Sequence, residues 1–218
     1  MSFVRLDGSM ADDLSVVNAA RVSFGKRKEV MDDADTGLIN FLMRERHGTP
    51  FEHNSFRFHV RCPIFVAREW FRHRIGSFNE FSARYAEVEP GAWVPPAHTV
   101  RSQVGVPGAY KFESMAKHLQ EEVVAAIEES NGRAYRRYKY LLNIGVAKEI
   151  ARTVLPMGTY TEFYWTVNAR SLMNFLSLRT ADTAQAEIRD YAQSVEDHFA
   201  DSMPITHRAW NNNGRVAP

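Results

Sequence analysis

One short stretch of the chain alternates between hydrophobic and polar residues, the pattern of a half-buried β-strand, and a second stretch has the composition of a strand. In NSFRFHVRC, residues 54–62, the side chains of Phe56, Phe58 and Cys62 share one face, and basic residues and a histidine occupy the other. TYTEFYWTV, residues 159–167, is rich in aromatic and β-branched residues, which favour strands. The pattern therefore predicts two strands of one sheet.

Helical spacing of hydrophobic residues dominates the rest of the chain. Helices are predicted over residues 12–24, 32–46, 63–74, 109–144, 168–179 and 184–203. Acidic residues open the first two helices, Pro63 suits the first position of the third, and Asn131-Gly132 is expected to break the fourth. Residues 90–108 are rich in Pro and Gly and are predicted to be loop, and residues 211–218 to be a frayed tail.

This mixture predicts an α+β fold, a helix-rich single domain around a mostly antiparallel sheet. One catalytic domain over residues 1–210 fits the length of 218 residues, and 44% hydrophobic and 24% charged residues are ordinary for a globular protein. No hydrophobic run is long enough to span a membrane and the start has no signal-peptide pattern, so a cytoplasmic location is expected.

Charge limits the possible partners. The net charge of +1 argues against a general binder of nucleic acid, although 21 of the 27 basic residues are arginine, which suits recognition of particular anions. A module that grips single-stranded nucleic acid is one alternative, and it predicts steep salt dependence. The single Cys62 excludes an intramolecular disulfide and fits a reducing compartment.

The most polar stretch is RHRIGSFNEFSARY, residues 72–85. Just before it, Arg68, Glu69 and Arg72 share one helix face, and an exposed stripe of ion pairs would also explain these three residues. The polarity continues in the following loop with Arg74, Ser77, Asn79, Glu80, Ser82 and Arg84. Because arginine offers a planar fork of donors to phosphate oxygens, this stretch is a candidate anion site.

A second candidate is the predicted helix NARSLMNFLSLR, residues 168–179. In a helix, Asn168 and Arg179 point nearly the same way about 16 Å apart, whereas Arg170 and Asn174 share another side. Polar residues that interrupt so apolar a helix are either surface and capping positions or members of a site.

The stretch HGTPFEH contains His47, Thr49, Glu52 and His53, and His59 follows it. Histidine and carboxylate groups bind zinc, but the spacing matches no helical histidine pair, so no metal site is predicted. A metal-dependent nucleotide hydrolase is the alternative, and it predicts bound metal. Cys62 is in phase with the buried face of its strand and is interpreted as a small hydrophobic residue rather than a nucleophile.

Several of these stretches together match a known pattern. RHRIGSFNEFSARY meets every fixed position of RHR-x-x-S-x-N-x-x-S-x-R-Y and so resembles the signature of the flavin-dependent thymidylate synthases. HGTPFEH, PIFVAREWFRHR, EIARTVLP and FYWTVNARSLMNFLSLR also resemble segments of that family, in the family's order. Together they cover most of residues 47–85 and 147–192.

The resemblance implies a fold of the thymidylate synthase-complementing type and a methyltransferase of dTMP biosynthesis. The family converts dUMP to dTMP, with 5,10-methylenetetrahydrofolate as the carbon donor and NADPH as the reductant through bound FAD. By resemblance, the FAD contacts are Thr49, Arg72, His73, Arg74, Glu80, Asn168, Ala169, Arg170 and Asn174. The dUMP contacts are Glu69, Trp70, Phe71, Arg72, Glu80, Phe81, Ser82, Ala83, Arg84, Arg152 and Arg179. The partners implied are small molecules, with no nucleic acid and no membrane.

The resemblance also implies roles. Arg179 is expected to be catalytic, beside N3 of the uracil ring, where a guanidinium stabilises negative charge. The reduced flavin supplies the hydride that completes the methyl group, so Cys62 is not needed as a nucleophile. The family more often has Gln at the position of Glu69. It works as a homotetramer with active sites shared between subunits, so Arg84 and Arg152 are expected to reach a dUMP whose Arg179 comes from a neighbouring chain.

Overall fold

The computed structural model describes residues 2–218, which group into two compact units. Unit 1 contains the residues up to Cys62, Val66–Glu80 and Glu162–Pro218. Unit 2 contains Pro63–Phe65 and Phe81–Thr161. The single domain expected over residues 1–210 stays a prediction.

A four-stranded sheet forms the centre of unit 1, with the strand order β1-β2-β6-β3. The strands are β1 (Phe3–Met10), β2 (Ser55–Pro63), β3 (Ser77–Glu80) and β6 (Tyr160–Asn168). β1 pairs with β2 and β3 pairs with β6, both antiparallel. On β2, Phe56, Phe58, Val60 and Cys62 are buried, so the predicted alternation is confirmed. The predicted α+β fold with a mostly antiparallel sheet is confirmed as well.

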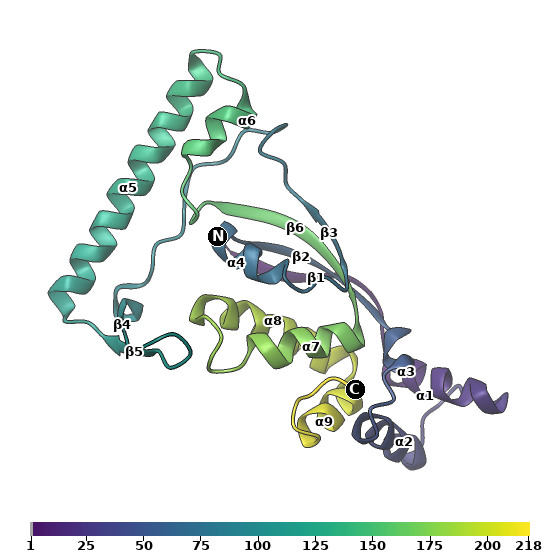
Figure 1. Cartoon of the computed structure of the whole chain (residues 1–218). Helices are drawn as coiled ribbons and strands as arrows, with labels where there is room; N and C mark the ends of the chain where they lie inside the picture. The colour runs from purple at the N-terminus through teal and green to yellow at the C-terminus, as the bar shows by residue number, and fades with distance from the viewer. Residues whose placement is uncertain (1) are drawn as a thin grey trace. The chain divides into compact units, whose positions relative to one another are not determined.

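Most helices of unit 1 pack on one another. The helices of unit 1 are α1 (Asp13–Arg21), α2 (Asp33–Arg44), α3 (Thr49–Glu52), α4 (Ile64–Trp70, entering from unit 2), α7 (Ala169–Arg179), α8 (Ala186–Ser202) and α9 (Pro204–Asn212), with a 3-10 turn at Val22–Phe24. Helices α7 and α8 lie along one face of this sheet, whereas α1, α2 and α3 lie beyond its end (Figure 1). Asp12 caps α1 by accepting from the backbone N–H of Ser15, and Asp32 opens α2 with a capping box, which explains the acidic starts. Pro63 ends β2 instead of beginning α4.

The core of unit 1 is aromatic. Trp70 on α4 contacts Phe163 and Trp165 of β6 and Phe175 of α7, with ring centroids 4.9–5.5 Å apart. All four side chains are almost completely buried. Burial of such large apolar surfaces fixes α4 and α7 against the sheet, and the polar residues that follow α4 and line α7 are placed by this packing.

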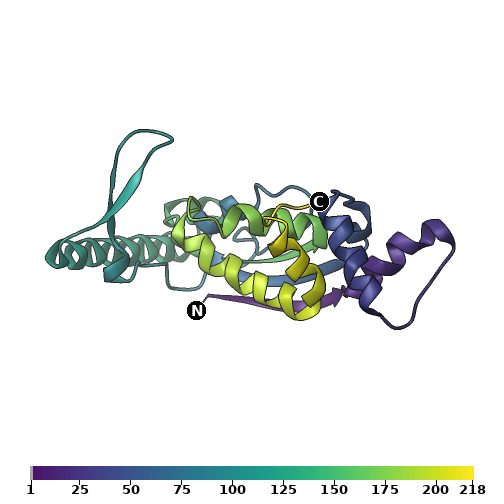
Figure 2. The ribbon, with the colours of Figure 1, turned by 90° about the horizontal axis from the view of Figure 1, so that it is seen from below.

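Unit 2 is built on one long helix, α5 (Lys117–Asn143). The predicted break at Asn131-Gly132 was wrong: the cost of one glycine, about 1 kcal/mol, is small beside the packing of α5, which includes the buried Tyr138 against Val88 and Ala151. Unit 2 also contains the 3-10 turn Ala97–Thr99, β4 (Arg101–Val104), β5 (Lys111–Ser114), α6 (Lys148–Ala151) and the 3-10 turn Arg152–Val154. β4 and β5 form an antiparallel hairpin that stands away from α5 (Figure 2). β4 lies in the segment predicted to be loop, but β5 lies in the first part of the helix predicted over residues 109–144, so that prediction was wrong before Lys117, where α5 begins.

The segment after α9 is held by side-chain contacts, although it was expected to fray. Both terminal nitrogens of Arg215 contact the carboxylate of Glu196, at 2.7 and 2.6 Å, and the side chain of Glu196 is only 8% exposed. The guanidinium of Arg215 also lies 4.1 Å from the ring centre of Trp210. Beyond it, Arg46 donates to the carbonyl of Val216 at 3.0 Å. Within residues 2–218, no helix combines the length and hydrophobicity needed to cross a membrane.

Candidate functional site

The polar residues of unit 1 surround an open cavity of about 670 Å³. Its lining consists of Glu52, Arg72, His73, Arg74, Ile75, Arg170, Ser171, Asn174, Leu178, Arg179, Ala217 and Pro218. Six of these residues were predicted as ligand contacts, and they come from two separate stretches of the sequence. Four of the six are arginines, so the cavity is suited to an anion.

Helix α7 supplies three of the predicted residues from one rigid element. Leu172, Met173, Phe175 and Leu176 bury its other face. Arg170 and Asn174 are four residues apart and therefore lie one above the other at the cavity, as their spacing indicated. Arg179 ends the helix and completes this wall.

The turn after α4 supplies Arg72, His73 and Arg74 and meets Arg179. Nε of Arg179 donates to Nε2 of His73 at 2.9 Å, and Nη1 donates to Oε2 of Glu69 at 2.8 Å. Nη2 of Arg179 donates to the backbone carbonyl of Glu69 at 3.1 Å. Burial and the neighbouring positive charge of Arg179 lower the pKa of His73 to about 4. His73 is therefore neutral at pH 7 and accepts a hydrogen bond from the arginine.

Arg170 is fixed at the opposite side of the lining. Nη1 donates to Oε1 of Glu52 at 2.6 Å, and Nε donates to the backbone oxygen of Pro218 at 2.5 Å. Gly48 lies directly against this side chain, since a Cβ atom there would be 2.5 Å from Nε of Arg170. The HGTPFEH stretch thus contributes to the site by leaving room for Arg170.

Several predicted contacts do not line this cavity. Trp70 is fully buried and Phe71 packs on Phe78 and Phe163, so neither indole nor ring faces the cavity. Asn168 caps α7 by accepting from the backbone N–H of Ser171 at 2.8 Å. The other predicted contacts of unit 1 that lie outside the lining are Thr49, Glu69, Glu80 and Ala169.

Unit 2 contains a second group of predicted residues, Phe81, Ser82, Ala83, Arg84 and Arg152. Nε of Arg84 lies 3.3 Å from Oε2 of Glu149, and Nε of Arg152 donates to the backbone carbonyl of the same residue at 3.4 Å. Ala83 packs against the hydrophobic cluster of α5. The two arginines therefore contact the same residue, Glu149, at an exposed surface.

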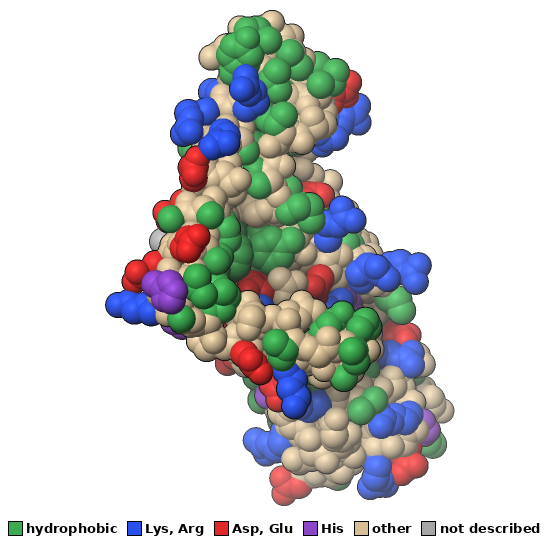
Figure 3. All heavy atoms as spheres, turned by 60° about the vertical axis from the view of Figure 1, so that its left-hand side comes forward, with side chains coloured by type: hydrophobic (Ala, Val, Ile, Leu, Met, Phe, Trp, Pro, Cys, Tyr) green, Lys and Arg blue, Asp and Glu red, His purple; other side chains and the backbone are tan. Residues whose placement is uncertain are grey.

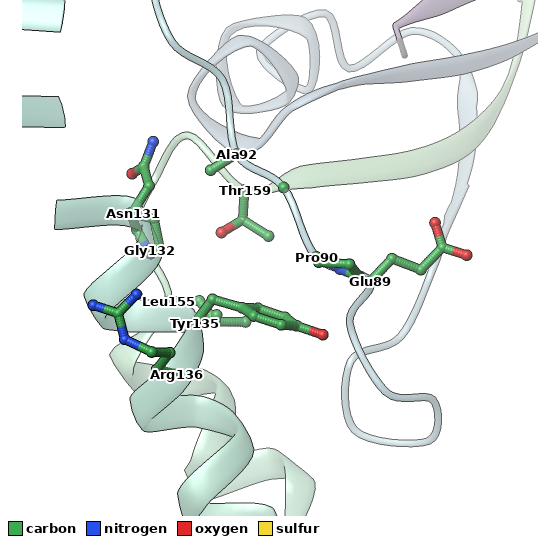
Figure 4. Close-up of a pocket in the computed structure, with 11 residues that line it drawn as sticks. Glu89, Pro90, Ala92, Asn131, Gly132, Tyr135, Arg136, Leu155 and Thr159 are labelled. Atoms are coloured by element: carbon green, nitrogen blue, oxygen red, sulfur yellow. The ribbon is translucent and has the colours of Figure 1, made fainter. Parts of the chain in front are cut away.

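A cavity of about 280 Å³ also lies within unit 2, between α5 and the segments 89–92 and 155–159 (Figure 4). Pro90, Ala92, Tyr135 and Leu155 form much of its wall. None of the residues predicted for a ligand lines it. Apolar walls without a converging set of charged groups make it a poorer candidate for nucleotide chemistry than the cavity of unit 1.

Two features of the described residues bear on the alternatives of metal and thiol chemistry. Among residues 2–218, no three His, Cys, Asp or Glu side chains are grouped so that they could hold a metal ion. Cys62 is fully buried, and burial, followed by the nearby charge of Glu80, raises its pKa far above the usual range. A thiol in this state is unreactive.

Comparison with known proteins gives the context of this geometry. Residues 5–205 match the family model described as thymidylate synthase complementing protein. The chain belongs to this family. The flavin-dependent thymidylate synthase of Thermosipho africanus is 49% identical over 208 residues, which cover 95% of this chain and 90% of the relative. That of Streptomyces coelicolor is 46% identical over 228 residues, covering 99% and 93%.

Solved structures agree with the thymidylate synthase-complementing fold. The UMP/dUMP methylase PolB from Streptomyces cacaoi, bound with 5-Br UMP, superimposes with a TM-score of 0.91 at 45% identity and covers 100% of this chain and 97% of that one. The same enzyme bound with 5-Br dUMP gives a TM-score of 0.92. The predicted family and fold type are confirmed.

In this thymidylate synthase-complementing protein, the sequence did not indicate several residues that lie beside the predicted ligand contacts, either in the cavity of unit 1 or near Arg84 in unit 2. Ser171 and Leu178 lie on the same face of α7 as Arg170 and Asn174, so helical spacing could have included them. Ala217 and Pro218 could not be found this way, because their position depends on contacts far along the chain, such as that of Pro218 with Arg170. The others are Glu52, Ile75 and Glu149.

Proposed function

We propose that this protein is a FAD-dependent thymidylate synthase that methylates C5 of the uracil ring of dUMP. The carbon donor is 5,10-methylenetetrahydrofolate and the reductant is NADPH. The observation that carries the proposal is the family match over residues 5–205 together with six predicted ligand residues around one cavity of unit 1.

The donor set of the cavity fits FAD. Arg72, Arg74 and Arg170 offer guanidinium groups to two phosphates, and Asn174 offers an amide that both donates and accepts hydrogen bonds. Only one acidic side chain, that of Glu52, belongs to the lining. Bound FAD would supply the hydride that completes the methyl group.

Arg179 would act on the uracil. C5 of the ring becomes nucleophilic when the ring carries negative charge, and a fixed guanidinium in a partly buried site stabilises that charge. The side chain of Arg179 is 20% exposed and already held by Glu69 and His73. Cys62 is buried and unreactive, so it offers no thiolate, and activation of C5 would depend on polarisation of the ring.

The residues of unit 2 would hold the phosphate of dUMP. Ser82, Arg84 and Arg152 offer a hydroxyl and two guanidiniums at one surface, and the phosphate would replace the carboxylate of Glu149 on Arg84. Trp70, Phe71, Phe81 and Ala83 would contribute through their backbone groups, since two of these side chains pack in the core and a third against the α5 cluster.

The visible spectrum and one substrate assay test the proposal. Purified protein should bind FAD, bleach with NADPH under anaerobic conditions and form dTMP from dUMP. Arg170→Ala should lose FAD, whereas Arg208→Ala, an exposed arginine of α9, should retain it. UMP should be assayed beside dUMP, because the structurally similar PolB is a UMP/dUMP methylase. A protein that binds no FAD and converts neither nucleotide would contradict the proposal.

A homotetramer with shared sites, in the cytoplasm, is the second part of the proposal. It is supported by exposed hydrophobic residues of unit 2: Figure 3 shows such side chains gathered over the end of α5 and over α6, where Tyr140, Ile144 and Ile150 are 52–59% exposed. Exposed apolar surface of this kind marks interaction sites.

Subunit exchange tests the sharing directly. Arg84→Ala and Arg179→Ala should each be inactive, but mixed after mild dissociation they should recover roughly a quarter of normal activity, because one pocket in a mixed pair is then entirely wild type. If both arginines serve a pocket made by the same chain, no mixture restores activity. Persistent inactivity despite proven exchange would exclude shared sites.

A further inference from the structure

The guanidinium of Arg179 is held before any ligand arrives. Its three hydrogen bonds go to the His73 ring, the Glu69 carboxylate and the Glu69 backbone carbonyl. A guanidinium has five N–H donors in one plane, so two remain, one on each terminal nitrogen. These two free donors can serve a ligand edge that carries two acceptors.

The two free donors determine which protonation state of the uracil ring Arg179 binds. N3 of neutral uracil carries a proton, and Arg179 has no acceptor with which to receive it. Once N3 is deprotonated, N3 and a neighbouring carbonyl oxygen form a pair of acceptors. The locked orientation of Arg179 therefore favours the ionised ring, which is the reactive one.

The same electrostatics explain why the carboxylate of Glu69 faces Arg179 and not the uracil ring. Its carboxylate is ionised in the pair with Arg179, at 2.8 Å, and its side chain is 29% exposed. An ionised carboxylate turned toward an ionised ring would repel it. Turned toward Arg179, it fixes the donor plane instead.

We propose that Glu69 is a positioning residue, which orients Arg179 for the uracil ring rather than contacting the ring itself. This inference rests on the proposed function and replaces the expected contact between Glu69 and dUMP. It separates two properties of the side chain: the oxygen that accepts from Nη1 is required, and the negative charge is dispensable.

Two substitutions separate those properties. Glu69→Gln keeps an oxygen acceptor at the same distance and removes the charge. The kcat for dTMP formation should therefore stay within about 3-fold of wild type, or increase because less negative charge lies near the ionised ring. Glu69→Ala removes the acceptor and frees Arg179, and kcat should fall on the order of 100-fold, the usual result of misplacing a catalytic group. The effect should appear in kcat more than in KM for dUMP, because Arg179 stabilises charge that develops during the reaction.

A matched control shows whether any partly exposed ion pair behaves this way. Glu162 pairs with Arg61 at 2.9 Å and with His59 at 3.1 Å, away from the cavity lining, and its side chain is 36% exposed. Glu162→Ala should keep wild-type kcat. All variants should bind FAD with the wild-type visible spectrum, which establishes that they fold.

The outcomes are distinct. A wild-type protein without FAD binding or turnover would refute the proposed function. With an active wild type, an inactive Glu69→Gln that retains FAD would overturn the positioning role and indicate that Glu69 accepts the N3 proton as a base. Wild-type kcat in Glu69→Ala would overturn it as well, since Arg179 would then need no support from this side chain.

Discussion

The ion pair between Arg215 and Glu196 allows a quantitative prediction. Glu196 is 8% exposed and receives two hydrogen bonds from Arg215 and one from His207 at 2.9 Å. Burial alone would raise the pKa of Glu196, but these hydrogen bonds lower it below its usual value. Arg215→Ala would leave the carboxylate buried with only the histidine as partner.

The expected loss of unfolding free energy follows from these contacts. Removing one partner of a fully buried pair costs about 3–5 kcal/mol. Arg215 is 36% exposed, so water will enter and hydrate Glu196, which reduces the electrostatic part to about 2 kcal/mol. The contact with Trp210 adds about 0.5–1 kcal/mol. The total is close to 3 kcal/mol.

Urea unfolding at pH 7, followed by circular dichroism, measures this loss, and hydrogen exchange locates it on α8 and α9. Arg215→Lys should lie between wild type and Arg215→Ala, since an ammonium group keeps the charge without the bidentate geometry. Arg208→Ala is the control, as an exposed arginine of the neighbouring helix. An unfolding free energy of Arg215→Ala within about 0.5 kcal/mol of that control, the scatter of ordinary surface substitutions, would refute the reasoning.

Three further predictions concern the site. Gly48→Ala should weaken FAD binding up to about tenfold, because its Cβ would displace Arg170. Gly37→Ala is the control, since Gly37 has open space around it, and equal FAD affinities of the two variants in titrations would contradict the prediction. The NMR signals of His73 should show no titration between pH 5 and 7, and a transition near pH 6.5 would disprove the neutral ring. Because the folded pKa of about 4 lies below the usual value, the folded state should also lose stability as pH falls from about 6.5 toward 4. Cys62→Ser should retain most dTMP formation with slightly lower stability, and an inactive but FAD-loaded variant would restore the thiolate mechanism.

The sequence predicts those parts of the fold that depend on local pattern. β2 follows period-two alternation, β6 has the aromatic and β-branched composition of a strand, and α7 follows helical spacing closely enough to place Arg170, Asn174 and Arg179 on one helix. β1 and β3 were missed because their residues are only partly buried or exposed, and their strand form comes from pairing with distant partners, such as Ser77 with Thr166.

The candidate site, too, can be predicted from the sequence only in part. Its residue types follow from the sequence motif, but the contacts among them do not. Glu69 and Arg179 are 110 positions apart, and no local pattern indicates that the carboxylate belongs to the arginine. Likewise, Glu149 lies beside Arg84 only because α6 folds back onto the segment that carries Ser82.

The single, buried cysteine has a practical consequence. Because Cys62 is the only thiol and is shielded from solvent, thiol-specific reagents will leave the native protein unlabelled. A cysteine introduced at an exposed helical position, such as Asp201 in unit 1 or Ala125 in unit 2, will therefore be the one site that reacts. Paired spin labels at these two positions would measure the distance between the units in solution, with Cys62 left in place, and would follow it as FAD and dUMP are added.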